Sequence, residues 1–200
     1  GPPRDLDVAD GSELRASGCD VVALVRAVRE GDARHHGLHH MAMREARQLQ
    51  ERLRQALGWP GREAERASSS AIDRHAMAGV ILAADSRSAY VARHRKHETA
   101  WANGGPELDL GRESALRLKQ EREQGRRDAS KVDAVLVLDT RAIGASARET
   151  RLIATCVMPV PLAWLVEAGL GEERLGSVTR ERGHIVASME RVYAGVLLQK

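Results

Sequence analysis

Two groups of side chains in this sequence have the types and spacing that could do chemistry. The first is the segment HHGLHH, in which His35 and His39, or His36 and His40, stand four residues apart. Imidazoles at this spacing on one face of a helix can chelate zinc. Gly37 disfavours a rigid helix here, and paired histidines without further ligands are more often the solvated start of a helix. We therefore expect no metal at this cluster.

The second group is the basic segment ARHRKH, which contains Arg93, Arg95 and Lys96, with His94 between the two arginines. It opens a part of the chain whose pattern favours strands, and an exposed strand could present its guanidinium groups to phosphates with little sequence discrimination. Basic residues also recur over 117–131, where glutamates dilute their charge. The first cluster is therefore the better candidate for a phosphate-binding site.

Catalytic signatures are absent from the sequence. It contains no GxxxxGK[ST] phosphate loop, no HExxH, no GxSxG and no GxGxxG after a strand. We therefore expect no nucleotide hydrolysis, no catalytic residue and no bound cofactor in this chain alone.

Composition narrows the class of protein further. The 200 residues carry a net charge of +3 and are 42% hydrophobic, with three Trp, two Tyr and no Phe, so the core must be aliphatic. Trp101 is expected to fill this core rather than stack on a base. Cys19 and Cys156 are far apart and are expected to be inert packing residues. No apolar run reaches membrane length, so we expect a cytoplasmic protein that contacts no membrane.

The elements that must position these groups follow from hydrophobic periodicity. Helices are predicted over 20–30, 38–57 and 71–84, the last capped by Ser69 or Ser70 and containing the run AMAGVILAA, predicted to be almost wholly buried. The first two should bury one stripe each, formed by Val21, Leu24, Val25 and Val28, and by Met41, Ala42, Leu49, Leu53 and Leu57.

Strand signals begin after Asp85, and Asn103 to Pro106 mark a tight turn. The charged stretch 111–131 is compatible with a helix only in its first half. The last 70 residues should form an antiparallel sheet with one helix at about 159–169. Helices followed by strands predict an α+β fold. Because the chain opens with GPPRD and without Met, residues 1–18 are expected to be a disordered or tag-derived lead-in to an excised fragment.

Several segments, and the order in which they occur along the chain, resemble the region that follows the motor domains in DEAH-box ATP-dependent helicases of the HrpB branch. The resemblance rests on MREARQLQERLRQALG, YVARHR, WANGGPELDLGRESAL, the pair VDAVLVLDT and ETRLIATCVMPV, and ERLGSVTRERGHIVASMERVYAGVLL, and it covers about residues 19–198. It implies the end of a ratchet-like helical domain over 19–85. It further implies an antiparallel OB-like β-barrel that starts within 86–131, and a small β-rich C-terminal piece within 132–200.

The same resemblance implies that Arg93 and Arg95 lie in a basic strand of the barrel and that Asn103 and Gly104 form the turn after it. The expected function is an accessory region of an ATP-dependent helicase that binds single-stranded RNA or DNA through backbone phosphates. ATP, magnesium and the motor domains would belong to the rest of the same polypeptide. Two further hypotheses are a protein-interaction module built on amphipathic helices, and a metal-dependent enzyme centred on His35 to His40.

Overall fold

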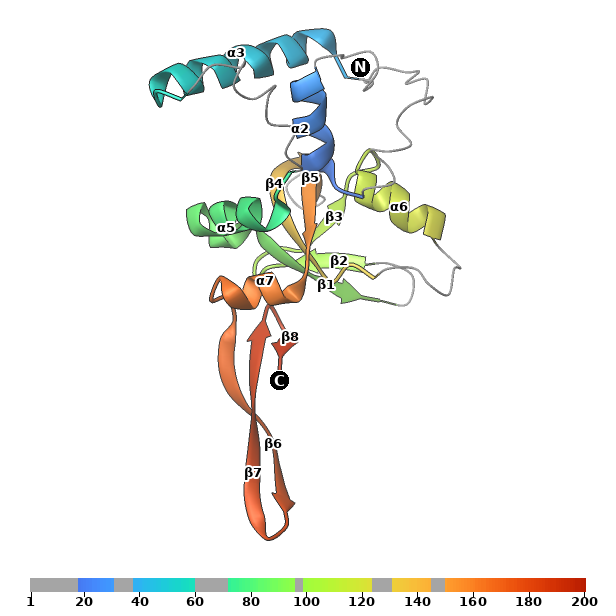
Figure 1. Cartoon of the computed structure of the whole chain (residues 1–200). Helices are drawn as coiled ribbons and strands as arrows, with labels where there is room; N and C mark the ends of the chain where they lie inside the picture. The colour runs from blue at the N-terminus through green and yellow to red at the C-terminus, as the bar shows by residue number, and fades with distance from the viewer. Residues whose placement is uncertain (1–17, 31–37, 60–71, 96–98, 124–130, 145–149) are drawn as a thin grey trace.

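The computed structural model describes residues 18–30, 38–59, 72–95, 99–123, 131–144 and 150–200. Helices and strands are both present, which confirms the α+β class (Figure 1). All but one residue of the expected lead-in over 1–18 lies outside these ranges. None of the described helices has the length and apolar content needed to cross a bilayer.

Five strands close into a barrel in the order β1-β2-β3-β5-β4. Their bounds are Ala89–His94 for β1, Thr99–Ala102 for β2, Leu108–Leu110 for β3, Ala134–Ile143 for β4 and Arg151–Val160 for β5. Neighbouring strands are antiparallel except β3 and β5, which are parallel. The sheet predicted for the last 70 residues is therefore wrong in part, because β4 and β5 join the earlier strands instead of β6 to β8.

The interior of the barrel is filled by alternating apolar side chains. Trp101 is fully buried among Leu108, Val135 and Val157, as predicted for a core residue. Helix α6, Ala115–Glu123, adds Leu116 to the same cluster. This helix confirms that the first half of the charged stretch is helical.

A second apolar cluster lies between the outer face of the barrel and three helices. These are α2 (Asp20–Glu30), α5 (Arg74–Ala84) and α7 (Leu162–Glu167), which surround the barrel in Figure 1. They contribute Val22, Leu82 and Leu165 against Leu136 and Met158. The predicted stripe of α2 is buried only in part, because Leu24 is 42% exposed.

Both cysteines lie at this helix-covered side of the barrel. Cys19 is fully buried and Cys156 on β5 is partly buried; neither forms a disulfide. Burial is the main cause that raises the pKa of Cys156 to about 12 and also raises that of Cys19. The structure therefore agrees with the interpretation of both residues as packing groups.

A buried carboxylate at the start of α2 links three elements. Asp20 accepts hydrogen bonds from the backbone N–H of Ala115 at 2.7 Å, from the backbone N–H of Val157 at 3.0 Å and from the Ser114 hydroxyl at 3.0 Å. It therefore ties α2 to the beginning of α6 and to β5. Burial raises the pKa of Asp20 even though these three donors favour its charged form.

Helix α5 differs from the prediction at its start and in its burial. Asp73, not Ser69 or Ser70, caps it by accepting a hydrogen bond from the N–H of Ala76 at 3.0 Å. Val80 within the apolar run is 70% exposed, although Ala78 and Leu82 are buried. The helix lies on the surface of the barrel, so only one of its faces is covered and the expectation of near-complete burial is wrong.

Helix α3, His40–Ala56, confirms a helix within 38–57 but not its inward face. The predicted inward residues Met41, Ala42, Leu49, Leu53 and Leu57 are all exposed, the leucines by 50–58%. Instead Met43 and Arg54 are buried, and Arg47 donates to the carbonyl of Val28 in α2 at 3.4 Å. Among the described residues, nothing covers the apolar stripe.

Beyond α7, three antiparallel strands form a separate sheet in the order β6-β7-β8. They span Glu172–Glu181, His184–Tyr193 and Val196–Gln199. The Tyr193 hydroxyl donates to the carbonyl of Ala89 on β1 at 2.9 Å, which fixes the base of this sheet to the barrel. The β6–β7 hairpin then extends away from the barrel (Figure 1).

Candidate nucleic-acid interface

The predicted basic strand is present and faces solvent at its end. Arg93, His94 and Arg95 are exposed, whereas Ala89, Val91 and Ala92 earlier on β1 are buried. The change occurs because the first half of the strand lies beneath helices and the second half runs beyond them. Lys96, the third predicted basic residue, lies outside the described residues.

One carboxylate binds both arginines of this strand. Glu107 Oε1 accepts from Arg93 Nη1 at 3.0 Å, and Glu107 Oε2 accepts from Arg95 Nη2 at 2.6 Å. Arg93 also donates from Nη2 to the carbonyl of Ala194 at 2.7 Å, so it connects the barrel to the C-terminal sheet. Arg93 therefore has a structural role, and Arg95 is the one of the two that lines the pocket described next.

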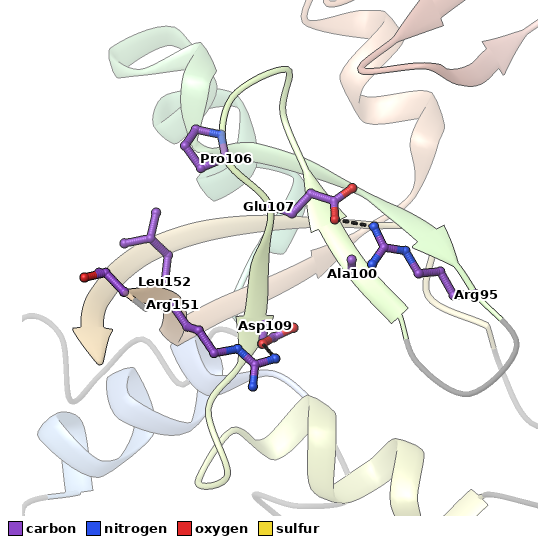
Figure 2. Close-up of a pocket in the computed structure, with 8 residues that line it drawn as sticks. Arg95, Ala100, Pro106, Glu107, Asp109, Arg151 and Leu152 are labelled. Carbon is purple, nitrogen blue, oxygen red and sulfur yellow. Dashed lines mark hydrogen bonds and ion pairs between the residues drawn. The ribbon is translucent and has the colours of Figure 1, made fainter. Parts of the chain in front are cut away.

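An open pocket of about 450 Å³ lies beside Arg95 on the outer face of the barrel (Figure 2). Its floor comes from Ala100 on β2 and Asp109 on β3, together with Glu107, which directly precedes β3. Its lining residues are Arg95, Ala100, Pro106, Glu107, Asp109, Thr150, Arg151 and Leu152. Segments from the two halves of the barrel sequence therefore meet at one site.

Sequence reasoning missed Arg151, which lies on the far side of the pocket from Arg95 (Figure 2). Its guanidinium donates to Asp109 Oδ2 at 2.7 Å, and its side chain is 71% exposed. It is the first residue of β5, and β5 pairs with β3, so the pairing of Asp109 with Ile153 brings it to the pocket. The only signal in the sequence was an arginine at the start of an apolar strand.

The predicted turn residues do not line the pocket. Asn103 donates from Nδ2 to the carbonyl of Arg87 at 2.8 Å, and its Oδ1 accepts from the N–H of Gly105 at 3.0 Å. Gly104 has a φ of +91°, a conformation that favours glycine. The turn prediction is therefore confirmed: one side-chain contact of Asn103 lies within the turn, and the other attaches the turn to Arg87.

The histidine cluster is described only in part, since His35 and His36 lie outside the described residues. His39 and His40 are exposed, and their rings stack with centroids 5.0 Å apart. In the part of the chain that the structure describes, no group of three or more His, Cys, Asp or Glu side chains is placed to hold a metal ion.

The side chains around the pocket carry both positive and negative charges, and the positive ones are in excess. Arg93, Arg95 and Arg151 face two carboxylates, Glu107 and Asp109. Each arginine side chain is at least 43% exposed, so an anion in solution can approach its guanidinium group. Two of the arginines, Arg95 and Arg151, line the pocket itself, so the arrangement is suited to binding an anionic chain.

No protein-family model matches this chain, and the search of curated proteins found no match. The candidate site is therefore argued from its geometry alone.

Proposed function

We propose that this chain binds single-stranded RNA or DNA through its backbone phosphates, as an accessory region of a cytoplasmic ATP-dependent helicase of the HrpB-like DEAH-box type. In this proposal the barrel is of the OB type and makes no bond itself. The motor domains that would hydrolyse ATP belong to the same polypeptide outside these 200 residues. The chain contributes position and charge to the path of the strand.

The observation that carries this proposal is the position of Arg95 and Arg151 on opposite sides of one pocket. Arg95 begins the β1–β2 loop and Arg151 is the first residue of β5, directly after the β4–β5 loop; the pocket between them lies over β2 and β3. In five-stranded OB-type barrels, these two loops and this face are where oligonucleotides bind. The five strands also form one closed sheet, which supports the assignment of the barrel to the OB type.

The chemistry of the pocket favours a phosphate backbone over a base. Its lining contains no aromatic side chain, and Trp101 on the adjacent strand is fully buried, so base stacking is not provided by the described pocket. Two guanidinium groups can each donate two parallel hydrogen bonds to a phosphate. Binding of this kind is weak, insensitive to sequence and strongly dependent on salt.

Fluorescence anisotropy with a labelled single-stranded oligonucleotide tests the proposal. Two phosphate contacts predict that the logarithm of the binding constant falls with the logarithm of salt concentration with a slope of about −1.4. Arg95→Glu and Arg151→Glu should each weaken binding and make this slope shallower. The matched control is Arg174→Glu, because Arg174 is 62% exposed and pairs with Glu190 at 3.3 Å on the C-terminal hairpin.

Equal affinity of wild type and both pocket variants would overturn the proposal, as would binding that does not change with salt. An equal loss of affinity in the Arg174→Glu control would show that only the overall charge matters. That result would also count against a defined site over β2 and β3.

One observation favours the alternative function of a protein-interaction module. The apolar stripe of α3, which includes Leu49, Leu53 and Leu57, is exposed among the described residues. Amphipathic helices use such a stripe to bind in a groove of a partner protein. Replacing Leu53 by Asp should abolish capture of such a partner in nuclease-treated extract while leaving oligonucleotide binding unchanged. A loss of oligonucleotide affinity in this variant would count against this separation of roles.

A further inference from the structure

The β6–β7 hairpin has one apolar face that is exposed along its length. Leu175 is opposite Met189, Val178 is opposite Ala187, and Arg180 is opposite Ile185. Directly opposed residues share a face of an antiparallel pair, and every second residue of β7 points to the same side. These six side chains therefore form one surface, here called the hairpin face. Its larger apolar members are exposed by 54–80%.

A bulge in β6 keeps this face continuous. The register shifts between Leu175 and Val178, where Gly176 and Ser177 together lie opposite the single residue Ser188. In a regular strand, two residues three positions apart point to opposite sides, whereas the bulge places Leu175 and Val178 on the same side. Gly176 is required for the close approach, because a Cβ there would lie 2.6 Å from the Ser188 hydroxyl oxygen. The strand thus accommodates an irregularity that gathers its apolar residues on one side.

The opposite face of the hairpin is polar. Arg174 pairs with Glu190 at 3.3 Å, and the hydroxyls of Ser177 and Ser188 are 3.2 Å apart. This asymmetry is the pattern of a sheet with one solvated and one covered side. A two-stranded ribbon cannot cover its own apolar face and is marginally stable alone. The hairpin face therefore requires a second surface packed on it.

The charges at the two ends of the hairpin face identify that surface. Arg180 is exposed near the tip, and Glu173, 61% exposed, lies on the same side at the base, where it pairs with Arg191 at 2.5 Å. A copy of the same face, rotated by a two-fold axis, would place Arg180 of each copy over Glu173 of the other. The apolar centres would then cover each other at the usual spacing of stacked sheets.

We propose that this protein forms a homodimer in which the hairpin faces of two copies pack tip to base about a two-fold axis. Leu175, Val178, Ile185 and Met189 form its apolar centre. Two symmetric contacts between Arg180 and Glu173 flank this centre and set the antiparallel orientation. The surface lies on a different sheet from the candidate nucleic-acid pocket, so dimerisation and oligonucleotide binding can be tested separately.

Sedimentation velocity of the nuclease-treated full chain, over the micromolar range, tests this proposal. The wild type should show a monomer–dimer equilibrium that shifts to dimer as concentration rises. Ile185→Asp should leave a monomer at all concentrations. Val186→Asp is the matched control, since Val186 is the adjacent residue, is 43% exposed and points to the polar face. This control should dimerise like the wild type.

The orientation has its own test in complementary charge reversals. Arg180→Glu places four carboxylates at the two contacts, and Glu173→Arg places arginines at both, so each variant alone should dimerise roughly ten-fold more weakly. An equimolar mixture of the two variants restores opposite charges at both contacts and should recover the dimer.

A wild type that stays monomeric throughout the range overturns the proposal, including the case in which another protein or a nucleic acid covers the hairpin face. Equal effects of Ile185→Asp and Val186→Asp also overturn it. Failure of the mixture to recover the dimer overturns the tip-to-base orientation.

Discussion

Replacing Glu107 by Gln should increase the affinity for a single strand. The Glu107 carboxylate neutralises Arg93 and Arg95 at 3.0 and 2.6 Å, and an incoming phosphate must compete with it for Arg95. All three side chains are 28–54% exposed, so each ion pair is worth only about 0.2–1 kcal/mol. Releasing one such pair corresponds to a gain in affinity of about 1.4- to five-fold. Removal of the negative charge should also steepen the salt dependence.

Anisotropy titrations at several salt concentrations measure both effects on one labelled oligonucleotide. Glu121→Gln is a suitable control because it also removes an arginine's carboxylate partner, at 2.9 Å from Arg117, but on α6 outside the pocket lining. The control should bind like the wild type. If Glu107→Gln binds no more tightly, or binds more weakly while its unfolding midpoint is unchanged, the competition between carboxylate and phosphate at Arg95 is refuted.

The remaining predictions of this group concern stability and reactivity. Asp20→Ala leaves three buried donors without their acceptor, so urea titration should show a loss of several kcal/mol, on the basis of about 1–3 kcal/mol per unsatisfied group. Because burial raises the pKa of Asp20 in the folded state, that state binds more protons between the ordinary and the raised values. The Asp20 contribution to the free energy of unfolding should fall as pH rises through this window and stay constant above it, as pH-dependent urea titrations can show by comparing the wild type with Asp20→Asn. Tyr193→Phe removes the bond to the carbonyl of Ala89 and should cost about 0.5–1.5 kcal/mol, with faster amide exchange at the base of the C-terminal sheet. Cys156, with a pKa of about 12, should react with a disulfide reagent at pH 8 much more slowly than free cysteine does.

Local patterns predicted most of the elements. The helices α2, α3 and α5 and the strand-rich region after Asp85 follow from periodicity, and the turn at Asn103 and Gly104 follows from its residue types. These features depend on neighbouring residues in the chain, where sequence patterns are most informative. Residue type does not distinguish Asp73, the cap of α5, from Ser69 or Ser70, because both serine and aspartate can cap a helix.

Pairings between distant segments could not be predicted in the same way. The parallel contact of β3 with β5 joins residues more than 40 positions apart and brings Arg151 into a pocket begun by Arg95. The barrel as a whole shows the same limit, because its strands come from both sides of the charged stretch that ends at residue 131. Periodicity reports which face of a segment is apolar, but not which other segment covers it; the exposed stripe of α3 illustrates this limit.

The role of the basic strand shows why residue type alone does not define a binding site. Arg93 on β1 and Arg95, one residue beyond the end of β1, are both exposed, and residue type alone does not distinguish them. In the fold, Arg93 donates from Nη1 to Glu107 and from Nη2 to the Ala194 carbonyl, whereas Arg95 lines the pocket. Arg93→Ala should therefore weaken the attachment of the C-terminal sheet more than oligonucleotide binding, while Arg95→Ala should do the reverse. Amide exchange at the base of that sheet, compared with anisotropy on the same two variants, distinguishes the roles, and matching behaviour of the two variants would contradict this assignment.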